Sequence, residues 1–337
     1  CKVTELWTYP VKQCRGVSLK EAELTSTGLQ HDRRWAVVLY PAGTFLPNNQ
    51  RKFLSLIQPQ VDGNGVLTLT APTLEEWVSP IVADDWLSLP EQSKREEEAI
   101  DVDFGGTNGK VSCSVAEEET GGKGVVAVWI GRLLAIAKKR ARGEEISEED
   151  LQVPAEKEIV LVRAKGERRP ALEYEKWADL ADKEDVMSLS WFSPLHVISK
   201  ASLRELNERL EAAEMAAVGT HRFRPNIVLD GTEATPLQPY KEDEWTELEH
   251  EAKGGSPGVV LFVRKSTHRC SVTTISEQTG AFNGKMQPLR ELRAYRIFQG
   301  EDERDKQRYG RDPLFGLNVS NKGVTDVLAV GDTFHCR

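Results

Sequence analysis

Short apolar segments bounded by turn residues recur along the whole chain, and this feature most constrains the fold. Segments of this length are typical of β-strands and too short for most helices. We therefore predict strands at Val3 to Pro10, Trp35 to Tyr40, Phe53 to Ile57, Val66 to Thr70, Glu158 to Arg163, Ile227 to Asp230, Val259 to Arg264, Val272 to Ile275 and Val327 to Phe334. The turn signal Asp62-Gly63-Asn64-Gly65 comes directly before the strand at Val66.

Helical periodicity is clear in two places only. Between Val126 and Ala137 apolar residues recur every three to four positions, and the basic run 138–142 that follows is typical of a helix C-terminus. A second helix is expected to begin near Ser199 or Ser202, where Ser202 and Glu205 fit a capping box. Many strands with few helices favour a mixed α/β, β-rich architecture, either a barrel or mixed sheets, over a doubly wound sheet.

A length of 337 residues allows about two domains. The charge run at residues 93–98 is interpreted as a solvated boundary. We therefore predict a smaller β domain over residues 1–92 and a larger domain over residues 93–337. An acidic stretch near residues 143–154 is predicted to be an exposed insertion in the larger domain.

Charge and cysteine usage exclude several classes of protein. The 44 basic and 53 acidic residues give a net charge of −9, which argues against a nucleic-acid binder but leaves room for a local basic pocket. The most apolar stretch, 124–131, is far shorter than the ~20 residues of a membrane-spanning helix, so we expect no membrane span and no signal peptide. Five scattered cysteines without a C-x-x-C pair argue against zinc, haem and iron–sulfur motifs and favour an intracellular protein.

Four segments combine cations with turn or strand residues: 9–16, 31–35, 222–226 and 268–274. If they converge, they form a basic cavity with one thiol, Cys270. Arginine binds phosphate as a two-pronged fork and lysine as a point charge, so such a cavity suits a phosphate-bearing ligand, and the thiol suits a soft metal. Each cation could instead be an ordinary strand-end residue. Cys270 could also be a nucleophile with His268 or His221 as its base.

Several motifs occur together in an order that is specific to one family. They include Tyr9-Pro10-Val11-Lys12, Asp32-Arg33-Arg34-Trp35, Ser193-Pro194, Phe223-Arg224-Pro225-Asn226, Arg269-Cys270 and Pro313-Leu314-Phe315-Gly316. On these residues the chain resembles the MOSC superfamily, the molybdenum-cofactor-binding domain, and within it the mitochondrial amidoxime-reducing components. The resemblance runs from Val3 to Phe334. It implies a MOSC-type β-barrel domain preceded by a smaller N-terminal MOSC-associated β domain, with a few helices.

The resemblance also implies roles for individual residues. Cys270 matches the cysteine whose thiolate binds molybdenum, so it is the implied catalytic and metal-ligating residue. Lys12 and Arg33 match cations near the phosphate of the molybdopterin. The other implied cofactor-binding residues are Gln13, Ser193, Arg224 and Asn226.

The chain departs from the family pattern around the pocket. Gln13 stands where the family has a serine. Trp191 and Phe192 replace a small acidic loop just before Ser193, and Ser276 replaces an aspartate. These differences are expected to change the shape of the pocket, and with it the substrate range, more than the binding of the cofactor.

The implied function is a molybdenum-cofactor-dependent oxidoreductase that reduces small N-hydroxylated substrates such as amidoximes and hydroxylamines. The sequence carries no flavin, haem or iron–sulfur motif, so electrons must come from another protein. By resemblance the donors are cytochrome b5 and its NADH-dependent reductase. The alternatives are a carrier of the molybdenum cofactor, related to the C-terminal domain of the cofactor sulfurase, and a MOSC scaffold for protein interaction. The expected location is intracellular, either cytoplasmic or on the mitochondrial outer membrane if an N-terminal anchor precedes this sequence.

Overall fold

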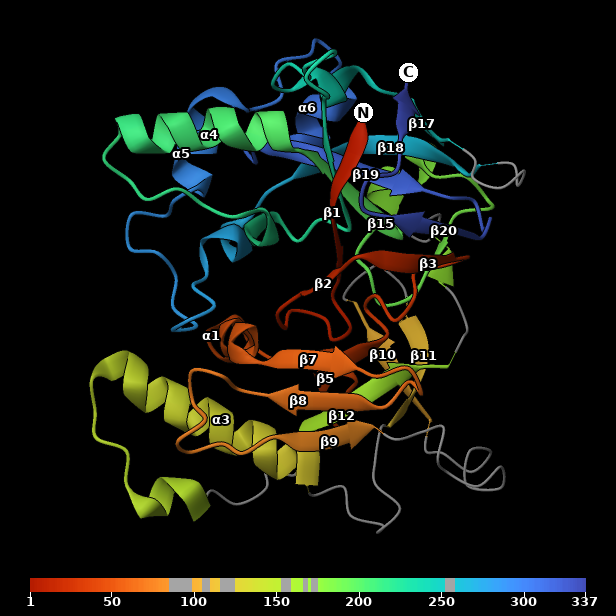
Figure 1. The fold of residues 1–337 in the computed structure, drawn as a ribbon. Helices are drawn as coiled ribbons and strands as arrows, with labels where there is room; N and C mark the ends of the chain where they lie inside the picture. The colour runs from red at the N-terminus through yellow and green to blue at the C-terminus, as the bar shows by residue number, and fades with distance from the viewer. Residues whose placement is uncertain are drawn as a thin grey trace.

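The computed structural model describes residues 1–84, 99–104, 110–115, 125–152, 159–165, 169–170, 175–251 and 258–337. These residues form a large sheet in one half of the molecule and a barrel with a small sheet in the other (Figure 1). Their helices are α1 (Asn48–Arg51), α3 (Val125–Arg142), α4 (Lys200–Ala212), α5 (Leu289–Tyr295) and α6 (Glu303–Tyr309). The prediction of a β-rich architecture with few helices is confirmed.

The large sheet has eight strands in the order β2-β1-β16-β15-β19-β18-β17-β21. They are β1 (Lys2–Thr8), β2 (Val17–Leu19), β15 (Leu195–Ser199), β16 (Ile227–Asp230), β17 (Glu247–His250), β18 (Val260–His268), β19 (Leu314–Ser320) and β21 (Phe334–Cys336). All neighbours are antiparallel except β15 and β16, which are parallel. Helices α4 and α5 cover one face, where Leu206, Leu210 and Leu292 are buried against it.

The other half contains a closed barrel of five strands. They are β5 (Trp35–Leu39), β6 (Thr44–Phe45), β10 (Ala99–Asp103), β11 (Lys110–Val115) and β12 (Ile159–Ala164). A three-stranded sheet lies beside it, made of β7 (Gln58–Val61), β8 (Leu67–Thr70) and β9 (Ile81–Asp84). Helix α3 contacts both β12 and β9, so its apolar face closes the core of this half.

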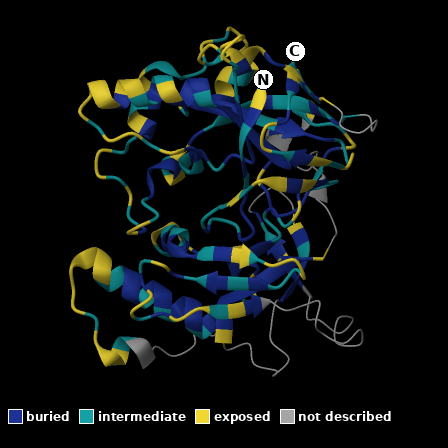
Figure 2. Cartoon of the chain, viewed as in Figure 1, coloured by how far each residue is buried: buried dark blue, intermediate teal, exposed yellow. Residues whose placement is uncertain are grey.

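The remaining elements connect these parts. Two small sheets are formed by β3 (Glu21–Thr25), β4 (Gly28–Leu29) and β20 (Asp326–Ala329), and by β13 (Arg169–Pro170) and β14 (Val186–Met187). Short 3-10 helices are η1 (Lys52–Leu56), η4 (Glu148–Gln152), η6 (Glu175–Leu180), η7 (Thr220–Phe223), η8 (Lys241–Glu244) and η9 (Ser271–Thr274). Buried residues follow the strands, and the outer face of α4 is largely exposed (Figure 2).

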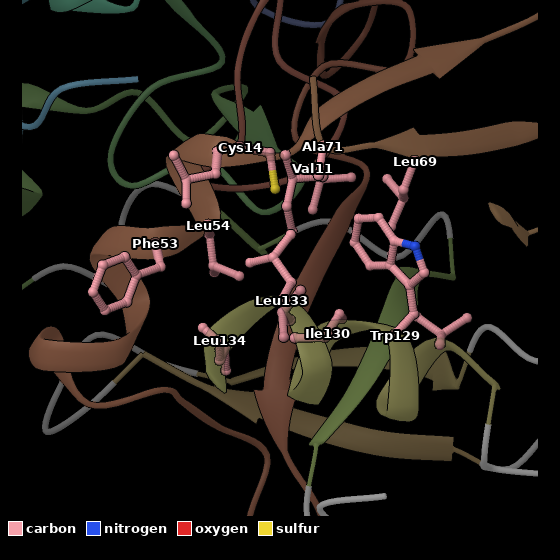
Figure 3. Packing of buried hydrophobic residues seen from close by; sticks show 14 of the residues in the cluster. Val11, Cys14, Phe53, Leu54, Leu69, Ala71, Trp129, Ile130, Leu133 and Leu134 are labelled. Carbon is pink, nitrogen blue, oxygen red and sulfur yellow. The ribbon is translucent and has the colours of Figure 1, made fainter. Parts of the chain in front are cut away.

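The loop that follows β1 leaves the large sheet and enters the core of the barrel half. Val11 and Cys14 are completely buried there and belong to the same apolar cluster as Leu133 and Leu134 of α3 (Figure 3). Lys12 and Gln13, which lie between these two anchors, are only half-buried. The loop is therefore held by burial at Val11 and Cys14, and the two residues between them are less buried.

Two predicted strands are wrong. Phe53 to Ile57 is mostly the 3-10 helix η1, whose tighter turn buries Phe53 and Leu56 together. Val272 to Ile275 is η9, where the Thr273 and Thr274 hydroxyls donate to backbone carbonyl groups three residues earlier. Such local hydrogen bonds compete with strand pairing and outweigh the β-propensity of threonine and valine.

The predicted helices are confirmed, but one predicted cap is wrong. The Ser199 hydroxyl accepts from the backbone amide of Ser202 at 3.3 Å and is the N-cap of α4. Ser202 lies inside the helix, and its hydroxyl accepts from the amide of Tyr240 at 2.7 Å instead. Glu205 accepts from the hydroxyl of Tyr240 rather than closing a capping box. The last predicted strand, 327–334, is two strands, because Gly331 turns the chain at a φ of 96°.

The division into residues 1–92 and 93–337 stays a prediction, since residues 85–98, which include the charge run, lie outside the described residues. The closed barrel takes strands from both sides of this position. The acidic stretch 143–154 is described up to residue 152, where it is mostly exposed and forms η4, and residues 153 and 154 lie outside. In the described ranges, no helix is both long and apolar enough to cross a membrane.

A buried histidine ties the edge of the large sheet to β20. The two ring nitrogens of His250 lie 2.8 Å from a carboxylate oxygen of Asp326 and 2.9 Å from one of Asp332. Burial on its own would raise the pKa of Asp326. Hydrogen bonds from His250 and from two backbone amides outweigh this effect and bring the pKa below its ordinary value.

Replacing Asp326 with asparagine is expected to lower the free energy of unfolding by about 1 kcal/mol at pH 7, because a charge-assisted hydrogen bond is lost. The pKa of Asp326 is lower in the folded protein than in the unfolded chain, so the ionised carboxylate stabilises the fold at any pH above the unfolded pKa. This contribution is lost as the pH falls through the lower pKa of the folded protein. The difference between variant and parent should therefore be constant from pH 5 to 7 and shrink below about pH 4. Urea unfolding of variant and parent across this pH range measures the difference in the free energy of unfolding. A difference that grows in acid would contradict the prediction.

Candidate functional site

All seven predicted site residues line one cavity of about 450 Å³, here called the main cavity. It lies where the large sheet meets the barrel half, and its lining comes from loops between the elements of both. Lys12 and Gln13 come from the loop after β1, and Arg33 from the turn before β5. The others are Ser193 before β15, Arg224 and Asn226 between η7 and β16, and Cys270 after β18. The four segments that were separate in sequence do converge.

Cys270 is the one exposed cysteine of the five in the sequence, all of which lie in the described ranges. Burial raises the pKa of the Cys14 and Cys113 thiols to about 12, so both stay protonated and inert. Burial also raises the pKa of Cys336, to about 11. Cys270 begins the 3-10 helix η9 and lines the main cavity as well as a second cavity beside it. The only readily accessible thiol of the chain is thus at the cationic site.

Three of the seven residues have left-handed backbone conformations. The φ angles are 73° at Gln13, 47° at Arg33 and 53° at Arg224. A residue with a side chain adopts this region at a cost of about 1–2 kcal/mol, so it persists where the surroundings enforce it. The amide of Arg33 donates to the carbonyl of Tyr9 at 2.8 Å, and that of Arg224 donates to the carbonyl of His221 at 3.0 Å. These turns direct both guanidinium groups towards the cavity.

The guanidinium groups of Arg33 and Arg224 both lie close to the ring of Tyr9. The two Cζ atoms are 4.9 and 4.3 Å from the ring centre, within the range of a cation–π interaction. Arg33 also pairs with Asp32, and Arg224 donates to the carbonyl of Cys14. Burial lowers the pKa of Arg224 from its ordinary value, and the nearby charge of Arg33 lowers it further. Tyr9 therefore stabilises two like charges at short range, a role that its place in a motif did not reveal.

Asn226 and Ser193 make hydrogen bonds mainly within the protein. The Asn226 side chain is completely buried, accepts from Arg33 at 3.1 Å and from the amide of His196 at 3.1 Å, and donates to the carbonyl of Trp7. The Ser193 hydroxyl lies 2.9 Å from the carbonyl oxygen of Leu195. Both residues line the cavity, and in addition they hold its walls in place.

The ammonium group of Lys12 lies against three aromatic rings. It is 5.4 Å from the ring centre of Phe45, 4.9 Å from that of Phe104 and 5.8 Å from that of Trp191, and it donates to the carbonyl of Leu189 at 2.8 Å. Trp191, one of the departures from the family pattern, is 46% exposed and lines the main cavity. Lys12 thereby links the barrel half to the loop that carries Trp191.

Sequence reasoning missed several lining residues, of which Arg269 has the most contacts. Its guanidinium is buried, donates to the carbonyl of Phe315 at 2.9 and 2.7 Å and to that of Phe223 at 3.1 Å, and contacts His196. Burial lowers the pKa of Arg269 to about 9 and keeps that of His196 well below its ordinary value. The Arg269-Cys270 pair was visible in sequence, but only the fold shows that the arginine anchors the cysteine. Arg51 and Lys265 also line the cavity and carried no motif, and so does Arg222, which lies in the predicted segment 222–226 but was not named as a site residue.

The two histidines considered as bases for Cys270 have other neighbours. The ring of His268 stacks on that of Trp177, with centroids 5.7 Å apart and planes inclined by 11°. Nε2 of His221 lies 3.8 Å from a carboxylate oxygen of Glu277. A nucleophilic role for Cys270 remains untested by this geometry.

Comparison with known proteins agrees with the fold. The family described as "MOSC N-terminal beta barrel domain" matches residues 1–108, and the family described as "MOSC domain" matches residues 184–335. Mitochondrial amidoxime-reducing component 1 of Homo sapiens is 31% identical over 340 residues, which cover 98% of this chain and 81% of that protein. The chain belongs to the MOSC-domain family. Mitochondrial amidoxime reducing component 2 of Rattus norvegicus is 30% identical over 335 residues, covering 98% of the MOSC chain and 81% of the relative.

Proposed function

We propose that this MOSC-domain protein is a molybdenum-cofactor-dependent reductase of small N-hydroxylated compounds, such as amidoximes and hydroxylamines. One observation carries the proposal: the single exposed thiol of the chain lies in a cavity lined by arginine and lysine side chains from both halves of the molecule. Relatives named as amidoxime-reducing components match 98% of the chain, which supports this class of reaction.

The donor set of the main cavity fits a molybdenum cofactor. A thiolate is a soft ligand of the kind such a metal requires, and arginine forks suit the phosphate of the pterin. No aspartate or glutamate is among the described residues that line this cavity. The buried Thr267 hydroxyl, also in the lining, has no hydrogen-bond partner within the described part of the chain, so a polar group in the cavity would satisfy it.

Each part of the site has a separate task in this proposal. Cys270 would hold the metal, and Arg33 and Arg224 would hold the phosphate, oriented by Tyr9 and Asn226. When bound, the cofactor supplies the two-electron chemistry that cleaves the N–O bond, a reaction that consumes two electrons and two protons and releases water. The buried contacts of Arg269 keep Cys270 in position next to the cations, because the two residues are adjacent on the chain.

Electrons are proposed to come from cytochrome b5 and its NADH-dependent reductase, because the sequence has no redox motif of its own beyond the predicted metal site. An intracellular location is proposed because the relatives are named as mitochondrial proteins.

The proposal is tested by producing the chain in a host that makes molybdenum cofactor. We expect about one molybdenum per chain and conversion of benzamidoxime to benzamidine with a chemical reductant, and faster conversion with cytochrome b5, its reductase and NADH. Molybdenum without turnover would instead indicate a carrier of the cofactor. A protein with neither molybdenum nor turnover would contradict both functions.

A further inference from the structure

A second cavity of about 310 Å³, here called the side cavity, adjoins the main cavity at Cys270. Three of the predicted cofactor residues, Gln13, Arg224 and Cys270, line both cavities. The other four, Lys12, Arg33, Ser193 and Asn226, line only the main cavity. If the cofactor fills the main cavity, the side cavity is the remaining space from which a small molecule reaches the Cys270 thiol.

The described lining of the side cavity has more positive than negative charge. Arg51, Lys52, Arg222 and Arg224 line it, and Glu277 is the one acidic residue among the described lining residues. The described residues show no ion pair between Glu277 and Arg51, Lys52 or Arg222. The described lining therefore has four cations and one carboxylate, in a chain whose net charge is −9.

These cations are incompletely satisfied. Within the described part of the chain, Nη1 of Arg222 is buried and has no hydrogen-bond partner. Arg51 donates to the side chain of Asn48, a neutral group. Lys52 lies over the rings of Phe53 and Phe282, at 4.8 and 5.5 Å from their centres. Burial lowers the pKa of Arg51 and Arg222 from the ordinary value, and at Arg222 the charge of Glu277 opposes this effect without cancelling it.

A partly desolvated cation that has a free hydrogen-bond donor and lies in a cavity with an excess of positive charge gains free energy when an anion binds to it. The lining also has apolar residues, namely Val272, Ile275 and Phe282, of which Val272 and Phe282 are 37% and 38% exposed. This combination suits a small molecule with a flat apolar body and an anionic end. The volume of the side cavity is at the lower limit of ordinary ligand pockets, which begin at ~300 Å³.

We propose that the side cavity is the substrate compartment, and that Arg222, with Arg51 and Lys52, binds a carboxylate or phosphate on the part of the substrate remote from the N–O group. The inference rests on the proposed function and adds a substrate class to it, namely N-hydroxylated compounds with an anionic substituent. Arg51 and Arg222 also line the main cavity, so the phosphate of the cofactor is the other anion that they would bind, and the tests below separate these two sources.

The first test compares benzamidoxime with 4-carboxybenzamidoxime as substrates of the molybdenum-loaded protein. The parent is expected to have a KM for the carboxylated compound about tenfold lower than for the neutral one. Replacing Arg222 with glutamine should lower this preference by about a factor of ten, which is equivalent to about 1.4 kcal/mol. Lys285→Gln removes an exposed charge outside both cavities and is the matched control, with the preference of the parent retained.

The second measurement is the molybdenum and pterin content of Arg222→Gln and Arg51→Gln. Contents equal to the parent, together with a reduced preference, support a substrate site. A loss of cofactor in these variants would show that the cations bind the phosphate of the cofactor and would overturn the inference. A parent without preference for the carboxylated substrate would overturn it as well, even with full turnover of benzamidoxime.

The third measurement does not depend on turnover. Calorimetry compares binding of benzamide and 4-carboxybenzamide, which cannot be reduced at an N–O bond, to the parent and to Arg222→Gln. We expect the carboxylated compound to bind the parent more tightly and to lose about tenfold in affinity in the variant. Equal affinities of parent and variant contradict the anion site. Absence of benzamidoxime reduction contradicts the proposed function, and calorimetry still decides the question of the site.

Discussion

Replacing Cys270 with alanine is expected to remove molybdenum from the purified protein and to reduce benzamidoxime reduction to background. Cys270 is the one exposed cysteine of the five, and the described residues contain no group of three histidine, cysteine or acidic side chains that could hold a metal in its place. Elemental analysis and turnover with a chemical reductant measure the two effects. Because the side chain is exposed, the free energy of unfolding of the cofactor-free variant should stay within about 0.5 kcal/mol of the parent.

Two variants control this experiment. Cys336→Ala removes a half-buried thiol at the far end of the large sheet, away from both cavities, and should retain metal and turnover. Cys270→Ser keeps the size of the side chain but replaces the soft sulfur with a hard oxygen, and should retain little molybdenum. A Cys270→Ala protein that binds molybdenum like the parent would mean that the thiolate is not the ligand, and the proposed function would lose its main support.

Replacing Arg269 with methionine is expected to lower the free energy of unfolding by about 3–5 kcal/mol. The guanidinium of Arg269 is buried and satisfies the carbonyl groups of Phe315 and Phe223, which would lose their donors. A buried acceptor without a partner costs about 1–3 kcal/mol, and more than one acceptor is affected. Denaturant unfolding of the cofactor-free protein measures the change. Cofactor retention should fall too, since Cys270 follows Arg269 directly.

Arg304→Met is the matched control for this prediction. Its side chain is 64% exposed, and its ion pair with Asp179 at 2.9 Å is of a kind that contributes about 0–1 kcal/mol. Arg269→Lys keeps a charge but loses the planar fork, so its stability should be intermediate. If Arg269→Met and Arg304→Met lower the free energy of unfolding equally, the buried hydrogen bonds of Arg269 add little net stability.

Sequence patterns identified the elements of this fold better than their connections. The helical period at Val126 to Ala137 corresponds to α3, and most alternating segments are strands. The errors at Phe53 to Ile57 and Val272 to Ile275 arose where side-chain hydrogen bonds or tight packing override β-propensity. No local pattern indicates that the first strand belongs to the large sheet rather than to the barrel half, because that depends on pairing with a distant strand.

The site was predictable in part, and for a physical reason. Residues in loops that form cation-rich motifs, such as Arg33 and Arg224, could be singled out one segment at a time. Arg51 could not, because no motif contains it and only the fold brings it to the two cavities; Arg222 lies in the segment 222–226, but its part in the side cavity also depends on the fold. The contacts of Tyr9 with two guanidinium groups likewise depend on two left-handed turns that sequence alone does not specify.

The pairing of β1 with β16 has a consequence for how the protein is made. Leu6 pairs with Ile227, roughly 220 residues later, so a ribosome that adds ~5–20 residues per second leaves β1 without its partner for on the order of 10–40 s. During this time β1 exposes an unpaired edge, the kind of surface that aggregates or recruits chaperones. The part of the main cavity that contains Lys12 and Arg33 meets the part that contains Cys270 only after β18 has been translated. If the proposed function holds, the cofactor would bind to the complete site only after β18 has been made.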